Sequence, residues 1–291
     1  MQYSFENLKE VEITDPSMIK FLSRRKFSIC FDKGAWIAGG FARALAQQAL
    51  TEQGTKMKAC EIQWQFREYF QQGGDIDVFF SDVLRVKSAY EELVSPIIPQ
   101  INGPFARNVM LNDTIKMQLV EKFIYADIKQ TFESFDFMNS CYAIRAESSR
   151  FYLVYHPKAW LFDRKNQLCV NHSNSPYTLS RMRKYLLHKG VDSIASESEE
   201  VFLEILIRAA CVLYDKKYNF HGTPLIYSCV KFLHAKGLIS MENVALFLGK
   251  FKIKVDNYGQ TYDWALRQIE RSACNTNNVY NKNVNEVKNA S

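Results

Sequence analysis

Two aspartates one residue apart, Asp75 and Asp77, stand in the stretch GGDIDVFF, between a glycine pair and a run of large apolar residues. If this run is a β-strand, both carboxylates project from one face of it, because residues two apart share a face. Like charges side by side repel unless a cation lies between them, and carboxylate oxygens suit hard ions such as Mg²⁺ or Mn²⁺. The pattern indicates a metal site; the alternative is a solvated pair in the turn made by Gly73 and Gly74.

The elements around the aspartates are expected to alternate between strand and helix. A short strand at residues 35–38 and a helix at residues 41–50, rich in alanine, leucine and glutamine, enclose the pair Gly39 and Gly40. The aspartates then begin a second strand at residues 75–80. The predicted order is therefore strand, glycine turn, helix, and later the strand with the two carboxylates.

The rest of the first half continues this mixed pattern. A helix is expected to start near Asp15 and Pro16, because proline suits the first helical turn. A further helix is predicted over residues 81–94, alternating residues predict a strand at 116–120, and another strand is expected at 135–138, with an extension toward residue 143. Residues 55–72 fit either a helix or a strand.

The second half is expected to be mainly helical and then polar. The predicted fold class is α+β: a mixed sheet with flanking helices over residues 1–150, a mainly α-helical basic domain over residues 151–274, and a disordered tail over residues 275–291, which are rich in asparagine. The longest periodic stretches are residues 178–189, 197–216, 225–236 and 262–271.

Composition excludes several classes of protein. The seven cysteines are scattered without a C-x-x-C pair, which argues against a disulfide framework or a zinc site and favours a reducing, cytoplasmic location. No apolar run approaches the roughly 20 residues of a membrane span. The five histidines lack metal-ligand spacing, and no P-loop motif is present.

Positive charge is concentrated in the second half of the chain. Residues 1–150 contain 18 Lys and Arg against 19 Asp and Glu, whereas residues 151–291 contain 19 against 12. This asymmetry suits a C-terminal half that meets a polyanion such as RNA. The alternative is a basic surface without a specific partner.

Three pieces together resemble the signature of the nucleotidyltransferase fold shared by DNA polymerase β, poly(A) polymerases and CCA-adding enzymes. They are the glycine pair Gly39-Gly40 before a helix, the D-x-D of Asp75 and Asp77, and Asp136 between two phenylalanines on a later strand. In that family the three carboxylates hold the two metal ions of nucleotidyl transfer. The resemblance thus implies that Asp75, Asp77 and Asp136 are both the catalytic residues and the metal ligands.

The resemblance also implies residues that bind the nucleotide. Gly39 and Gly40 would let the backbone approach the triphosphate, at the N-terminus of the following helix. Arg43 completes a G-G-x-x-R pattern like that of bacterial-type CCA-adding and poly(A) polymerases, in which the arginine faces the triphosphate; the alternative is a solvated helix arginine. Glu121 is a second candidate for the third carboxylate.

Departures from the family pattern indicate a divergent member, of viral or phage type. Ser134 and Phe135 stand where the family has paired arginines before the third carboxylate, and Ala44 replaces the acidic residue that usually follows the glycine-motif arginine. Asn139 comes one position early. Addition of CCA specifically is therefore not implied.

A second stretch, residues 175–190, predicts a helix with one basic and one apolar face. Arg181, Lys184, Tyr185 and His188 share one face at helical spacing, whereas Met182 belongs to the apolar face. It resembles the helix that follows the catalytic head of template-independent polymerases. Arg181 and Lys184 are thus candidates for contacts to the nucleotide or RNA, against the alternative of a solvated basic face.

These features lead to one main functional hypothesis and two alternatives. The main hypothesis is a metal-dependent, template-independent transferase that moves NMP from an NTP to an RNA 3′ end and releases pyrophosphate. The first alternative replaces RNA by a protein or a small molecule as the acceptor. The second alternative is a catalytically inactive homologue that binds RNA.

Overall fold

The computed structural model describes residues 3–57, 66, 69–71, 73–94, 105–111, 115–171, 181–182, 185 and 190–195. The chain divides into two compact units, Met1–His172 and Ser173–Ser291. The boundary predicted at residue 150 is therefore wrong, since residue 150 begins a strand of the first unit's central sheet. The predicted C-terminal helices and tail lie almost entirely outside the described residues.

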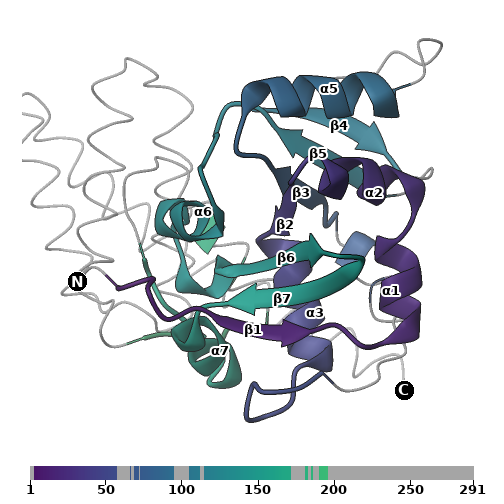
Figure 1. Cartoon of the computed structure of the whole chain (residues 1–291). Helices are drawn as coiled ribbons and strands as arrows, with labels where there is room; N and C mark the ends of the chain where they lie inside the picture. The colour runs from purple at the N-terminus through teal and green to yellow at the C-terminus, as the bar shows by residue number, and fades with distance from the viewer. Residues whose placement is uncertain are drawn as a thin grey trace, which may run out of the picture. The chain divides into compact units, whose positions relative to one another are not determined.

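The first unit is built on a seven-stranded mixed sheet with the order β1-β7-β6-β2-β3-β5-β4 (Figure 1). Strands β3 and β5 are parallel, and every other neighbouring pair is antiparallel. The strands are β1 (Lys9–Glu12), β2 (Trp36–Ala38), β3 (Ile76–Phe79), β4 (Ala106–Met110), β5 (Lys116–Val120), β6 (Tyr142–Glu147) and β7 (Arg150–Tyr155).

Short helices connect these strands, and aspartates begin three of them. Asp15, Asp82 and Asp127 each accept a hydrogen bond from a backbone N–H of the first turn, which satisfies a group that the helix itself leaves unpaired. The helices are α1 (Pro16–Leu22), α2 (Arg25–Asp32), α3 (Gly40–Ala49), α5 (Val83–Leu93), α6 (Ile128–Ser134), the 3₁₀ helix η1 (Met138–Ser140) and α7 (Pro157–Arg164). Two short strands follow, β8 (Gln167–Leu168) in the first unit and β9 (Ser193–Ile194) in the second.

The two faces of the sheet differ in chemistry. One face carries Ile37 and the residues that pair with it across the sheet, Val78 and Ile144, all of which are buried. Helices α3 and α5 pack on this apolar face, and α3 lies behind β6 and β7 in Figure 1. The opposite face carries Trp36 and Asp77, because residues alternate between faces along each strand. Helix α6 covers part of this second face, where Trp36 Nε1 donates to Thr131 Oγ1 at 3.1 Å.

The mixed α and β character, the strand at β2, the helix at α3 and the strand at β3 confirm the sequence predictions. The strand predicted at residues 135–138 is wrong. Asp127 caps α6, which runs to Ser134, and the chain then bends into η1 with only an isolated bridge from Phe137 to Val170. The alternation of Phe and Asp at these positions does not mark a half-buried strand. The neighbouring residues Asp136 and Phe137 are both buried, because the chain bends here.

The hairpin of β6 and β7 is absent from the sequence prediction because its turn lacks an Asn-Gly or Asp-Gly signal. Ser148 and Ser149 form the turn with φ values of 49° and 65°. Positive φ at both central residues gives the twist that matches antiparallel strands, but it is unfavourable for L-residues other than glycine, asparagine and aspartate.

Among the described residues, no helix has the length and apolar content to cross a bilayer.

Replacing Ser148 and Ser149 together by Asn and Gly should stabilise the first unit. Both new residues tolerate positive φ, so the free energy of unfolding should rise by about 1 kcal/mol. Urea unfolding followed by circular dichroism measures this change. Ser23→Gly is the matched control, because Ser23 has a φ of −81° and the same substitution should not stabilise the protein there. Equal or lower stability of the double variant would refute the turn assignment.

Candidate functional site

The carboxylates of Asp75 and Asp77 lie side by side at the start of β3. Asp75 directly precedes the strand and Asp77 is its second residue, and both are partly exposed. In the amide orientation that satisfies both groups, the Gln118 nitrogen donates to Asp75 Oδ2 at 2.9 Å and to Asp77 Oδ1 at 3.0 Å. The two carboxylates therefore converge on one point, as the D-x-D spacing predicts.

Two residues of β5, one charged and one neutral, contact this pair of carboxylates. Lys116 Nζ lies 3.5 Å from Asp75 Oδ2, and Gln118 is the register partner of Asp77 on the parallel neighbour strand. The Gln118 oxygen accepts from Lys116 Nζ at 3.1 Å. One ammonium and one amide thus offset the repulsion that two adjacent carboxylates would otherwise have.

The glycine turn lies next to the carboxylates. Ala38 pairs with Asp77 across β2 and β3, so Gly39 and Gly40 follow at the end of the sheet where Asp75 lies. Gly39 has a φ of 85° and forms the N-cap of α3, where its N–H donates to Tyr142 O at 2.9 Å. The sequence predicted that the glycine turn and the D-x-D belong together, and the tertiary structure brings them to one edge.

Tyr69 fills the space between the Gly39–Gly40 turn and the Gly73–Gly74 turn. Its hydroxyl donates to the backbone oxygen of Asp75 at 2.7 Å and lies 2.8 Å from the place where a Cβ of Gly40 would stand. A Cβ at Gly74 would lie 2.6 Å from Tyr69 Cδ1 and Cζ. Gly40 and Gly74 therefore lack side chains for a reason that the sequence does not reveal, which is the close approach of one aromatic ring.

Aromatic contacts hold Tyr69 in this position. Phe41 of α3 packs against Phe66, Tyr69 and Phe70, with ring centroids 4.9 to 6.1 Å apart. These three partners have the spacing of one helical face. The ring of Tyr69 is thus fixed to the first turn of α3.

Asp136 does not complete a metal-binding triad with Asp75 and Asp77. It is 5% exposed and lies in the bend after α6, where its backbone oxygen accepts from Asn171 N at 2.8 Å. Within the part of the chain that the structure describes, no three His, Cys, Asp or Glu side chains are grouped closely enough to hold a metal ion. The predicted strand that would have aimed Asp136 at the pair is replaced by a bend and a 3₁₀ turn.

Glu121, the second candidate for the third carboxylate, is committed elsewhere. It forms a two-pronged ion pair with Arg107, with both N–O distances 2.8 Å. The hydrogen bonds from Arg107 lower the pKa of Glu121. It belongs to the β4–β5 ladder and not to the carboxylate pair.

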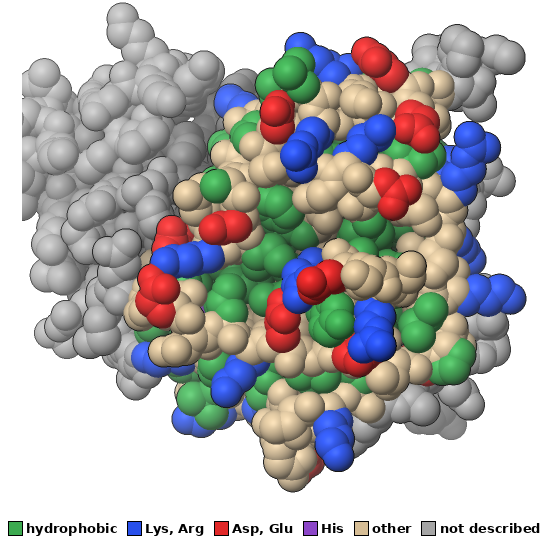
Figure 2. Space-filling view, viewed as in Figure 1, with side chains coloured by type: hydrophobic (Ala, Val, Ile, Leu, Met, Phe, Trp, Pro, Cys, Tyr) green, Lys and Arg blue, Asp and Glu red, His purple; other side chains and the backbone are tan. Residues whose placement is uncertain are grey.

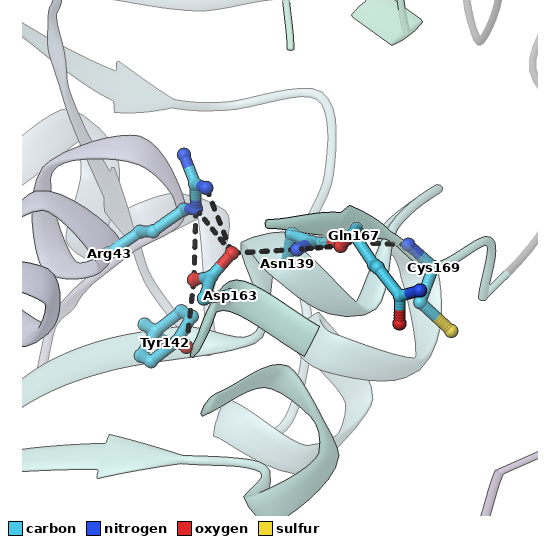
Figure 3. Close-up of polar contacts among 6 residues, drawn as sticks. All are labelled: Arg43, Asn139, Tyr142, Asp163, Gln167 and Cys169. Carbon is cyan, nitrogen blue, oxygen red and sulfur yellow. Dashed lines mark hydrogen bonds and ion pairs between the residues drawn. The ribbon is translucent and has the colours of Figure 1, made fainter. Parts of the chain in front are cut away.

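Arg43 has a structural role in this fold, which corrects the prediction that it faces a triphosphate. Its side chain is 3% exposed and binds the Asp163 carboxylate through Nε and Nη2 at 2.8 to 3.1 Å (Figure 3). A guanidinium committed to a buried carboxylate stays in the core.

Asp163 gathers further donors around the same carboxylate. Asn139 Nδ2 donates to Oδ1 at 2.7 Å, and the Tyr142 hydroxyl donates to Oδ2 at 2.9 Å (Figure 3). Burial, followed by the charge of Asp163, raises the pKa of Tyr142 well above its usual range, so the phenol stays protonated. Asn139 also donates to Gln167 O and accepts from Cys169 N, which ties in the segment after α7.

Arg181 and Lys184 belong to the second unit. Arg181 is an exposed helical residue, whereas Lys184 lies outside the described residues. Tyr185, predicted to share their basic face, is 9% exposed, and Met182 is 1% exposed. Tyr185 is therefore on the buried side with Met182, since residues three apart on a helix are neighbours.

The sequence reasoning missed four residues that shape the site: Tyr69, Lys116, Gln118 and Asp163. Gln118 lies in the predicted strand at residues 116–120, so its face could have been compared with that of Asp77 once the two strands were paired. No sequence pattern around Asp163 indicates its role. Its role depends on a partner 120 positions away.

A pocket of about 550 Å³ lies on the same face of the sheet as Asp77, over β2 and β6. Figure 2 shows hydrophobic side chains gathered in this hollow between acidic and basic groups. The basic side chains at its rim are already paired: Arg145 binds Glu10 at 2.5 and 2.9 Å, and Lys129 binds Glu6. The pocket therefore adds no reactive group to the site.

Breaking the buried ion pair should destabilise the fold strongly. Asp163→Asn or Arg43→Met leaves one buried charge without its partner, and we expect a loss of about 3 to 5 kcal/mol in the free energy of unfolding. Urea unfolding measures it. Glu52→Gln, in the exposed pair with Arg164, is the control and should change stability by less than about 0.5 kcal/mol. If Asp163→Asn matches this control, the structural role of Arg43 is wrong.

Gly74→Ala should destabilise the protein because its new methyl group overlaps the Tyr69 ring, at a cost of about 1 to 3 kcal/mol. Truncating the ring with Tyr69→Ala should remove this extra cost in the double variant. Gly73→Ala is the matched control. It is strained by its φ of 76° but has no neighbour within 4 Å, so Tyr69→Ala should not rescue it. A double-mutant cycle without coupling between Gly74 and Tyr69 would contradict the packing described.

Comparison with known proteins gives one family match and several distant structural likenesses. A CCA-adding enzyme in complex with ATP is 15% identical, with a TM-score of 0.45 over 80% of this chain and 52% of that one. An apo form of a CCA-adding enzyme is 13% identical, with a TM-score of 0.44 over 81% and 55%. The Thermotoga maritima CCA-adding enzyme with tRNA is 14% identical, with a TM-score of 0.36 over 86% of this chain and 52% of that one.

With TM-scores below 0.5, these likenesses do not establish a common fold, and the chain spans about half the length of the enzymes it matches. No curated protein matches the sequence. The family model of the Gabija anti-defense 2 proteins, Gad2, matches residues 8–161, which include the whole central sheet and the carboxylate pair. This match extends over more than half of the chain, and the protein therefore belongs to the Gabija anti-defense 2 family.

Proposed function

We propose that this protein transfers a nucleoside monophosphate from a nucleoside triphosphate to an acceptor hydroxyl at the Asp75–Asp77 edge of the sheet. The observation that carries the proposal is the convergence of these two carboxylates on one amide, beside the glycine turn that begins α3. Carboxylates at one edge and helix N–H groups at the same edge are what a triphosphate and its counter-ion need.

The donor set fits one hard divalent cation, Mg²⁺ or Mn²⁺. Asp75 and Asp77 would hold it with carboxylate oxygens, and the amide oxygen of Gln118 is a third ligand of the same chemical type within reach of both. When bound, such a cation neutralises phosphate charge and makes the attacking hydroxyl easier to deprotonate. The two-ion site implied by the sequence resemblance is not part of the proposal, since Asp136 does not join the pair.

The first turn of α3 would bind the phosphates. The first N–H groups of a helix have no partner within it and carry the positive end of the helix dipole. Gly39 and Gly40 bring no β-carbons to this end, and the Tyr69 hydroxyl, which donates to the Asp75 backbone oxygen, lies beside Gly40. Arg43, held in the core by Asp163, contributes by fixing α3 and not by touching phosphate.

We propose an RNA 3′ end as the acceptor, in the cytoplasm. The basic second half of the chain, with 19 Lys and Arg against 12 Asp and Glu, supports a polyanionic partner, and Arg181 and Lys184 are the proposed contacts. The family's description as anti-defense against Gabija makes a protein component of that defence the alternative acceptor to test beside RNA.

A non-catalytic role is the second candidate, and one observation favours it. Lys116 neutralises one of the two carboxylate charges and Gln118 donates to both Asp75 and Asp77, so the pair already has partners within the protein. On this view the protein counters Gabija by binding alone.

The two candidates differ in the effect of Asp75→Asn combined with Asp77→Asn. The purified protein is incubated with labelled ATP, CTP, GTP and UTP, Mg²⁺ or Mn²⁺, and either a mixed RNA pool or Gabija proteins. We expect label transfer by the wild type and a loss of at least about 100-fold in the double variant, because the oxygens that hold the cation lose their charge.

Asp32→Asn, an exposed aspartate on α2, is the matched control and should retain full transfer. Transfer that survives in the double variant would reject the proposed site. If neither protein transfers label and both counter Gabija equally in phage-infected cells, the binding role is correct and the transferase proposal is wrong.

A further inference from the structure

Gln118 occupies the position from which a residue can face both carboxylates. It is paired with Asp77 across the parallel strands β3 and β5, so its side chain leaves the sheet on the same face. Its neighbours along β5, Met117 and Leu119, are fully buried on the other face. A side chain here, between two apolar residues on an adjacent strand, is placed to contact both carboxylates, and in this chain it is an amide.

The orientation of this amide follows from charge. With its nitrogen toward Asp75 and Asp77, it donates one hydrogen to each carboxylate, and its oxygen faces Lys116 Nζ at 3.1 Å. The reverse orientation would give one bond, from Nε2 to Asn108 Oδ1 at 3.2 Å, while placing the amide oxygen against two anionic oxygens. The nitrogen-inward orientation is therefore the favourable one without a cation.

A bound cation reverses this preference. A divalent ion between Asp75 and Asp77 repels the N–H groups and attracts the amide oxygen, and a half-turn about the last side-chain bond of Gln118 exchanges the two ends. Lys116 does not prevent the exchange, because its side chain is 41% exposed and can move its ammonium into solvent. The same half-turn offers the amide nitrogen to Asn108 on β4.

Resting on the proposed function, we propose that Gln118 is the residue that limits this site to a single divalent cation: its amide bridges Asp75 and Asp77 through nitrogen in the cation-free protein and binds the cation through oxygen. The neutral amide supplies one ligand atom without the negative charge that a second ion would require. A carboxylate at this position should change both the stability of the cation-free protein and the binding of cations.

Titration with Mn²⁺ tests this proposal on the full-length protein, by calorimetry and by electron paramagnetic resonance of free Mn²⁺. We expect one Mn²⁺ per chain in the wild type and at least roughly tenfold tighter binding in Gln118→Glu, since a charged ligand replaces a neutral one. In EDTA the melting temperature of Gln118→Glu should fall below that of the wild type, because three carboxylates then repel, and Mn²⁺ should raise it more than in the wild type.

Gln118→Leu and Gln47→Glu are the controls. Leucine removes both ends of the amide, so we expect a lower melting temperature in EDTA and weaker Mn²⁺ binding. Gln47 is exposed on α3, which packs on the opposite face of the sheet, and the same change there should alter neither quantity. Binding of two ions or none by the wild type, or Mn²⁺ affinity unchanged in Gln118→Glu, would overturn the proposal.

Failure of this proposal and failure of the proposed function give different results. One Mn²⁺ per chain, tightened by Gln118→Glu, without any label transfer leaves the role of Gln118 intact and rejects the transferase. Label transfer that depends on Asp75 and Asp77, together with a Mn²⁺ affinity that substitution of Gln118 leaves unchanged, supports the transferase and rejects the proposed role of Gln118.

Discussion

A single buried carboxylate, that of Asp163, organises the end of the first unit that carries the candidate site. It receives Arg43 from α3, Asn139 from η1 and Tyr142 from β6, and it projects from α7. A buried anion is costly unless every lone pair has a donor, so these elements can pack together only in the arrangement that satisfies it. The position of α3 follows from this constraint, and with it the position of the glycine turn.

The division of the sheet into two chemically different faces follows from the packing of α3. Helices α3 and α5 pack on the apolar face, and the alternation of side chains leaves Asp77, Gln118 and Trp36 on the other. Asp75 and Asp77 can therefore stay partly solvated while the residues next to them are fully buried. Strand β3 therefore carries the charged edge on one face and part of the hydrophobic core on the other.

The candidate site has two acidic side chains and not three, so its negative charge is smaller than that of a three-carboxylate site. Asp75 and Asp77 carry two negative charges, which Lys116 and the amide of Gln118 offset. Lys116 cancels one of these charges and the amide donates to both carboxylates, so the pair has protein partners whether or not a cation binds. This arrangement is compatible with both candidate roles of a Gabija anti-defense protein, transfer and binding.

The sequence alone determined the local features of this protein. Alternation placed Asp75 and Asp77 on one face of a strand, and helix-forming residues after Gly39 and Gly40 specified α3, because these signals depend only on neighbours along the chain. Only the tertiary structure determined which residues contact one another. Asp163 takes Arg43 away from the solvent, Gln118 stands beside Asp77, and a bend after α6 keeps Asp136 out of the group. These outcomes depend on strand pairing and on the satisfaction of buried charge between residues far apart in sequence, and no local pattern contains that information.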